Sequence, residues 1–132
     1  MAYDSNELFS ELAGKGSGLR FFPSSVQPKT FAGGTGTIAK GTPLAYNTST
    51  NLWVVFDADG ANGTDTIKGF LWPDDHTLVS GSETISNVML TGRVHIDDIP
   101  VVTGYTLAEL KTALQTTARG NGIIVEGLEN FR

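Results

Sequence analysis

Two short apolar segments, Thr42 to Tyr46 and Leu52 to Phe56, are joined by a polar turn and give the clearest structural signal in this sequence. The connecting residues 47–51 are Asn, Thr, Ser, Thr and Asn, whose side chains can hydrogen-bond the backbone of their own turn. This pattern predicts a β-hairpin. The residues before it show almost no regular periodicity, so the regular fold is expected to begin late.

The composition favours one small domain built of strands and tight turns. The chain has 132 residues, which suits a single core, and its 16 glycines accompany few helix formers between residues 30 and 105. The first residues lack the basic and then apolar order of a signal peptide, and no apolar run is long enough for a membrane span. We therefore expect a soluble protein that is not exported by that route. The absence of cysteine excludes a disulfide framework and a thiol nucleophile.

Charge is divided unevenly along the chain, whose formal net charge is −5. Residues 12–56 contain no acidic residue and four dispersed basic ones, whereas acidic residues predominate from residue 57 to residue 109. A nucleic-acid interface normally requires a dense stripe of Lys and Arg. The pattern therefore indicates no direct binding of nucleic acid.

The first 36 residues read as an arm. Asp4 or Ser5 could cap a short helix that glycines 14, 16 and 18 end, and from Leu19 to Gly36 prolines, serines and glycines favour an extended path. We predict an N-terminal arm, residues 1–36, and a β-rich body, residues 37–132. The arm residues expected to anchor a partner are Phe21, Phe22, Val26, Lys29 and Phe31. In the alternative, the arm folds back and its phenylalanines cover an edge of the domain's own core.

The body shows further strand signals and one helix signal. Residues 66–72 and 122–126 read as strands, and residues 88–96 alternate, which predicts Val88 and Val94 on one face and Met89 and His95 on the other. Thr106 and Glu109 have the spacing of a capping box, followed by apolar residues at helical spacing, with Arg119 in the last turn and a stop at Gly120. One helix and about six short strands predict a mainly β, small α+β fold.

Two regions resemble metal sites only in part. The acidic loop of residues 57–65 has alanine and asparagine where the fifth and sixth positions of an EF-hand would lie, and Lys68 occupies the twelfth. Asp74, Asp75 and His76 could form one site with residues 95–98 only if the fold brought the two segments together. We predict solvated turns and no metal, with His95 as a surface or interface residue.

The sequence also gives little support for catalysis. Ser82 follows Gly81 but lacks the flanking glycines of a Gly-x-Ser-x-Gly nucleophile elbow, and the chain has only two histidines. The glycines at 34 and 36 form part of a dinucleotide fingerprint that neither follows a strand nor opens a helix. We predict no enzymatic activity, no catalytic residue and no cofactor.

The order and spacing of several short motifs over residues 32–126 resemble the family of the phage lambda head decoration protein. The motifs are Ala32–Gly34, Thr42–Leu44, Asn47–Thr50, the acidic glycine-containing loop from Asp57, Gly69–Leu71, Thr91–Val94 and Gly122–Val125. The helix from Leu107 matches only in place, and residues 1–31 match in character and length but not in motif.

The resemblance implies a non-enzymatic virion protein with a β-clip-like fold, a single domain with an extended N-terminal arm. Members of this family bind as homotrimers at threefold positions on the outer surface of the expanded head and clamp the major capsid protein against the pressure of packaged DNA. Such a protein is made in the host cytoplasm. A threefold contact would cover the face that carries Met89, Thr91, Arg93 and His95, which we predict as the trimer interface.

A carbohydrate or cell-surface binding module of a phage or bacterial surface is the alternative from a different class. In that hypothesis Trp53 and Trp72 would be the stacking platforms for sugar rings. The sequence favours core or subunit-interface positions for both, since Trp53 lies in an apolar strand and Trp72 precedes Pro73.

Overall fold

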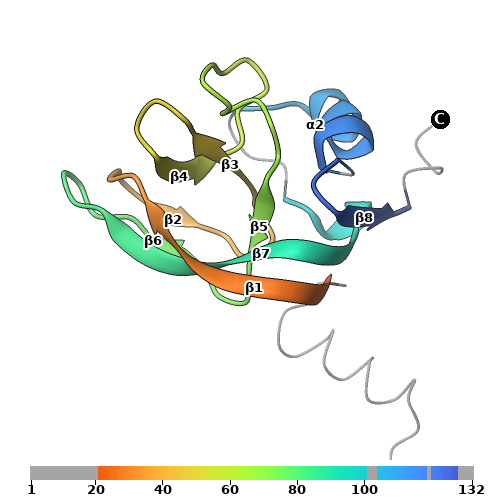
Figure 1. Cartoon of the computed structure of the whole chain (residues 1–132), viewed down its shortest axis with the longest axis horizontal. Helices are drawn as coiled ribbons and strands as arrows, with labels where there is room; N and C mark the ends of the chain where they lie inside the picture. The colour runs from red at the N-terminus through yellow and green to blue at the C-terminus, as the bar shows by residue number, and fades with distance from the viewer. Residues whose placement is uncertain (1–20, 101–103, 119, 128–132) are drawn as a thin grey trace, which may run out of the picture.

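A computed structural model describes residues 21–100, 104–118 and 120–127. It confirms the prediction of a mainly β fold with one α-helix in a single small domain. The described elements (Figure 1) are β1 (Phe21–Phe31), β2 (Thr37–Ile38), β3 (Pro43–Asn47), β4 (Leu52–Val55), β5 (Gly69–Leu71), β6 (His76–Thr77), β7 (Thr84–His95), η2 (Ile96–Asp98), α2 (Leu107–Ala113), η3 (Leu114–Ala118) and β8 (Ile123–Glu126).

The long strand β7 organises the sheet. One edge of β7 pairs antiparallel with β1, from Phe21 opposite Val94 to Phe31 opposite Thr84. Its other edge pairs first with β5 and then, in parallel, with β8. The hairpin strands β3 and β4 continue from β5, and Phe31 pairs with Trp53 on β4, so the strands β1-β4-β3-β5-β7 return to β1 and close a ring. The strands β2 and β6 form a separate two-stranded sheet.

The predicted hairpin is confirmed as β3 and β4, which pair from Leu44 opposite Val55 to Asn47 opposite Leu52. Its turn uses the expected side-chain chemistry, because Asn47 Oδ1 accepts hydrogen bonds from the backbone N–H groups of turn residues 49 and 50, at 2.9 and 3.3 Å. Asn51 has a φ of 61°, a conformation that asparagine tolerates better than most residues.

Two apolar clusters share the short pair β5–β7. Phe70 lies opposite Met89 and both belong to a cluster that includes Leu110, Leu114 and other residues of α2 and η3. Leu71 lies opposite Val88, and both belong to a second cluster with Phe31 and Trp53. Because successive strand residues face opposite sides, this pair is buried on both faces.

The prediction that residues 21–31 belong to an arm without a sheet of its own is wrong. These residues form β1, which pairs along its length with β7, and the alternative in which the segment folds back is the observed one (Figure 1). Phe21 and Phe31, at the two ends of β1, are buried in the two different clusters. The boundary at residue 36 is therefore not a boundary between arm and body. Residues 1–20, including the expected short helix, lie outside the described residues.

The strict alternation predicted for residues 88–96 is also wrong. Ser25 pairs with Thr91 and Val26 pairs with Met89, so Leu90 is an additional residue on β7. Such a bulge reverses which face the following side chains occupy. Met89 and Val94 consequently belong to the same core cluster, although the alternation placed them on opposite faces.

The helix begins as predicted and ends differently. Thr106 Oγ1 accepts from the Glu109 N–H at 3.2 Å and Glu109 Oε1 accepts from the Thr106 N–H at 2.9 Å, which is a complete capping box. After Ala113 the chain continues as a π-helical turn to Ala118, and the left-handed backbone conformation falls at Gly122 rather than Gly120. Arg119 lies outside the described residues. Among the helices described, none has the length and apolar character to cross a membrane.

Candidate interaction surface

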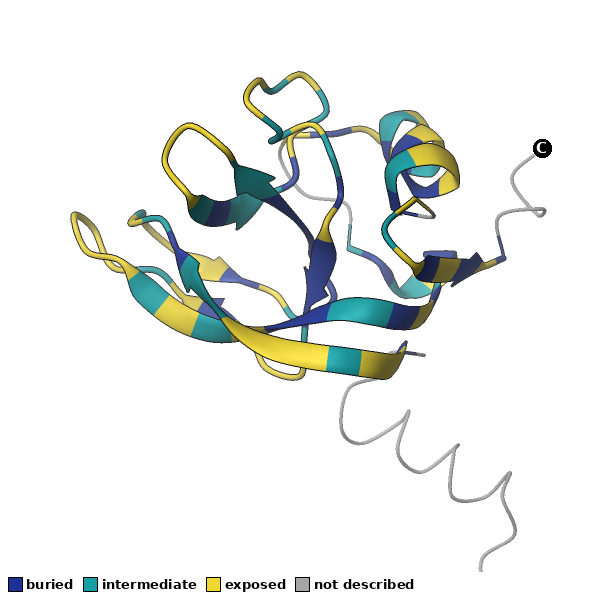
Figure 2. Ribbon diagram, in the orientation of Figure 1, coloured by how far each residue is buried: buried dark blue, intermediate teal, exposed yellow. Residues whose placement is uncertain are grey.

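Three neighbouring strands bring an arginine between two exposed apolar side chains. Phe22 on β1 lies opposite Arg93 on β7, and Arg93 lies opposite Ile124 on β8. Residues that are directly opposite across strands share one face of the sheet. Phe22 is 46% exposed and Ile124 is 57% exposed, so this face is open to solvent (Figure 2).

A groove of about 370 Å³ runs between these side chains, and we call it the Arg93 groove. Its lining residues are Phe22, Pro23, Ser24, Thr91, Gly92, Arg93, Gly122 and Ile124. Glycine is required at position 92, because φ is 147° and a methyl group there would lie 2.6 Å from the backbone oxygen of Phe22. The close approach of β1 and β7 thus leaves no room for a side chain at residue 92, within the lining of the groove.

Arg93 also pairs with a carboxylate. Its Nε lies 3.3 Å from Glu126 Oε1, and the two side chains are 55% and 49% exposed. An ion pair so open to water contributes little to the free energy of unfolding. The pair instead holds a charged group between the exposed side chains of Phe22 and Ile124.

Only two of the four residues predicted as a trimer interface line this groove. Thr91 and Arg93 do so, but Met89 is fully buried in the core, because both faces of the β5–β7 pair are covered and the bulge at Leu90 separates Met89 from the face of Arg93. His95 is half-buried and bonded within its own turn, where Nδ1 accepts from the Asp97 N–H at 3.2 Å and lies 3.7 Å from its carboxylate. The assignment of Met89 to an exposed interface is therefore wrong.

The residues predicted as capsid anchors are similarly divided. Phe21 and Phe31 are 6% and 0% exposed, so neither can enter a partner's pocket from the folded state. Phe22 and Val26 are exposed. The Lys29 ammonium lies 5.9 Å from the centre of the Trp53 ring, within the range of a cation–π contact.

The two tryptophans lie in or against the apolar clusters. Trp53 is 8% exposed, and its ring meets that of Tyr46 edge to face at 5.9 Å. Trp72 is half-buried, and its ring stacks on Phe21 at 5.0 Å with an interplanar angle of 2°. A sugar-binding platform needs an exposed ring face. The Trp53 ring is buried, and one face of the Trp72 ring is covered by Phe21.

Several of the side chains considered for metal binding have hydrogen-bond partners within the protein. His76 is buried, and its Nε2 lies 2.7 Å from Thr84 Oγ1. Asp75 Oδ1 accepts from the backbone N–H of Lys40 at 2.8 Å, and Asp57 Oδ1 accepts from that of Asp59 at 3.0 Å. Within residues 21–100, 104–118 and 120–127, no three His, Asp or Glu side chains lie together as a metal site would need.

Sequence reasoning missed Ile124, Pro23 and the two glycines of the groove. Ile124 stands between Ile123 and Val125, which are buried, so an uninterrupted apolar run gives no sign that its middle residue faces outward. The proximity of Phe22 to Arg93 depends on pairing between distant segments. No protein-family model matches the chain, and no curated protein shows significant similarity to it.

Proposed function

We propose that this chain is a non-enzymatic phage head decoration protein. It binds the major capsid protein on the outer surface of the expanded head, assembles there as a homotrimer at threefold positions, and stabilises the shell against the pressure of packaged DNA. It uses no metal or cofactor and makes no direct contact with nucleic acid.

The observation that carries the proposal is where the family-like motifs lie in the sheet. Pro43 and Leu44 of the Thr42–Leu44 motif pair with Phe70 and Gly69 of the Gly69–Leu71 motif. Residues 70 and 71 pair with β7 just before its Thr91–Val94 motif, which in turn pairs with the terminal 122–125 motif. Segments far apart in the sequence are thus successive neighbours in one sheet. This adjacency supports the resemblance, because the motifs whose order and spacing resemble the family belong to one connected sheet and not to several unrelated turns.

The Arg93 groove offers a surface for assembly. Arginine and aromatic residues are enriched in the central part of protein interfaces, and the groove presents Arg93 beside Phe22. Three copies around a threefold axis contact each other through two different patches, so this groove would receive another surface of its neighbour. Trimerisation also strengthens weak contacts with the shell, because the second and third contacts of one trimer become intramolecular.

The arrangement of β1 changes which residues can act as a flexible capsid contact. Residues 21–31 are a strand of the body, so they do not form part of an arm of the kind found in the family. The anchoring role that we first assigned to Phe21 and Phe31 is accordingly withdrawn, and Phe22 is assigned to the body surface.

The test adds the purified chain to undecorated, expanded heads of the phage that encodes it. We expect light scattering to give three times the 14.0 kDa chain mass, and quantitative mass spectrometry of washed heads to give a copy number comparable to that of the major capsid protein. The double variant Phe22→Ser with Ile124→Ser should be monomeric. The control variant Ile85→Ser removes an apolar side chain that is 70% exposed outside the groove and should leave the trimer intact.

Two results would overturn different parts of the proposal. If the chain does not bind expanded heads and is absent from purified virions, it is not a decoration protein. If a monomer binds heads with full affinity, the trimer and its avidity are removed while the capsid contact remains.

A further inference from the structure

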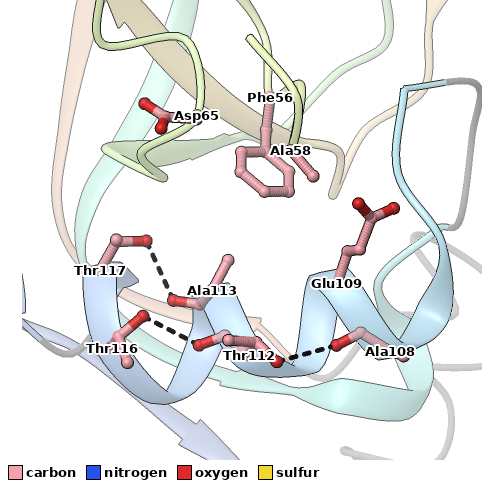
Figure 3. A pocket seen from close by; sticks show the side chains of 9 residues that line it. All are labelled: Phe56, Ala58, Asp65, Ala108, Glu109, Thr112, Ala113, Thr116 and Thr117. Carbon is pink, nitrogen blue, oxygen red and sulfur yellow. Dashed lines mark hydrogen bonds between the residues drawn. The ribbon is translucent and has the colours of Figure 1, made fainter. Parts of the chain in front are cut away.

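A second hollow lies on the other side of the molecule, between the helical segment and the loop that follows β4. It has a volume of about 360 Å³, and we call it the helix cleft. Its lining residues are Phe56, Ala58, Asp65, Ala108, Glu109, Thr112, Ala113, Thr116 and Thr117. In Figure 3 the Phe56 ring and Ala58 face the helix across the opening, with Asp65 and Glu109 on opposite sides.

The threonine hydroxyls of the cleft offer only acceptors to a ligand. Thr112, Thr116 and Thr117 each donate their proton to the backbone carbonyl four residues earlier, at 3.1, 2.9 and 2.9 Å (Figure 3). A hydroxyl has one proton and two lone pairs, so what remains is acceptor capacity. Thr117 already uses one lone pair for the Ile67 N–H at 3.2 Å, whereas Thr112 and Thr116 are exposed.

The two carboxylates reinforce this bias. Glu109 uses Oε1 to accept from the backbone of Thr106, and its other oxygen carries no part of the capping box. Asp65 is exposed on the facing loop. Among the described residues that line the cleft, none is basic and none has a side-chain donor with an unused proton. The polar lining therefore carries negative charge and hydrogen-bond acceptors, while Phe56, Ala58 and Ala113 supply apolar surface.

We propose that the helix cleft binds the side chain of an arginine presented by a partner polypeptide. The aliphatic stem of the arginine would pack against this apolar surface, as long cationic side chains commonly do. The guanidinium group has five N–H donors in a planar fork and suits a site with two carboxylates and two hydroxyl acceptors better than the compact ammonium of lysine. A polypeptide source fits better than free arginine, because nothing cationic in the cleft would balance the α-carboxylate. The proposal does not rest on the decoration function.

The test is an NMR titration of the full-length ¹⁵N-labelled chain with arginine blocked as its N-acetyl methylamide. We expect saturable shifts at the amides of Ala113 and Thr116, with a dissociation constant on the order of millimolar for so small a ligand. The blocked citrulline analogue has nearly the same shape without the charge and should bind about tenfold more weakly or worse. Raising the salt concentration should weaken only the arginine probe.

Three variants locate the charge recognition. Asp65→Asn and Glu109→Gln should each weaken arginine binding several-fold, and glutamine retains an oxygen for the capping bond to Thr106. The matched control is Asp59→Asn, which makes the same charge change on the same loop but does not line the cleft. It should leave binding within about twofold of the unaltered chain, since its exposed carboxylate lies outside the cleft lining and is screened by solvent and salt.

Several results would overturn the proposal. Equal binding of the citrulline probe would mean that the cleft recognises shape and not charge. An equal loss in the Asp59→Asn control would reduce the effect to net charge, and shifts confined to residues outside the cleft would place the ligand elsewhere. Lysine blocked as its N-acetyl methylamide is titrated in the same way, and tighter binding of lysine than of arginine would refute the assignment to arginine.

Discussion

Replacing Phe31 by alanine should destabilise the whole body, whereas the same replacement at Phe22, on the same strand, should not. Phe31 is 0% exposed, belongs to an apolar cluster, and packs its ring 4.9 Å from that of His76. Removing a buried phenylalanine side chain costs about 3–5 kcal/mol in the free energy of unfolding, from lost burial and from the cavity that remains. Phe22 is 46% exposed, so its truncation should cost less than about 1 kcal/mol.

The assay is equilibrium denaturation in urea, followed by the fluorescence of Trp53 and Trp72. The midpoint should fall sharply for Phe31→Ala and hardly move for Phe22→Ala, while the slope with denaturant stays the same in both. For a domain of this size the first variant should also melt lower by on the order of 10 °C or more. If both midpoints stay unchanged, the segment 21–31 is not part of the folded body, and the original interpretation as a free arm is restored.

Three further predictions follow from local geometry. Gly92→Ala should cost at least about 2 kcal/mol in unfolding free energy, because the added methyl group meets the backbone of β1 and the φ of 147° is strained for alanine; unchanged stability in urea would contradict that close approach. Thr106→Ala should cost about 1 kcal/mol and Thr106→Ser much less, since serine retains the hydroxyl that caps the helix; equal losses would mean that the cap contributes nothing. Dialysis against a chelator should change neither the melting temperature nor the mass in light scattering, and a loss of either would revive the loop of residues 57–65 as a calcium site.

The elements that the sequence predicted well are those specified by local chemistry. Asn47 forms the turn of the hairpin through its own side chain, and Thr106 with Glu109 forms the helix cap within four residues. Neither depends on the rest of the chain. Periodicity and capping therefore predicted the hairpin, the start of the helix and the fold class, although the bounds of several strands differ from the expected ones by a few residues.

The strand β1 could not be predicted in the same way. Its sequence contains Pro23 and Pro28, which lack the N–H of a sheet ladder, and its residues between the two ends are exposed or half-buried. A strand that is buried only at its ends shows no alternation, and proline is tolerated where one edge of a strand has few partners. The partner of β1 is also more than fifty residues away in the chain, so local patterns carry no information about it.

The candidate surface was partly predicted for a related reason. Thr91 and Arg93 line the Arg93 groove, whereas Met89 lies in the core, because a single additional residue at Leu90 exchanges the two faces of β7. Bulges of this kind arise from the pairing of both strands. A period of two along one strand cannot reveal them.

The burial of both ends of β1 has a consequence for binding by Phe22. Phe21 and Phe31 fix the strand in two separate clusters, and Phe22 projects from the strand next to the first of these fixed points. A contact residue held on a rigid element loses less conformational freedom on binding than one on a mobile arm, so more of its burial is retained as affinity. The phenylalanines that suggested a flexible anchor in the sequence therefore act together in a different way. Phe21 and Phe31 fix the strand and so hold Phe22 in position. In this arrangement any partner of the Arg93 groove meets a preformed surface.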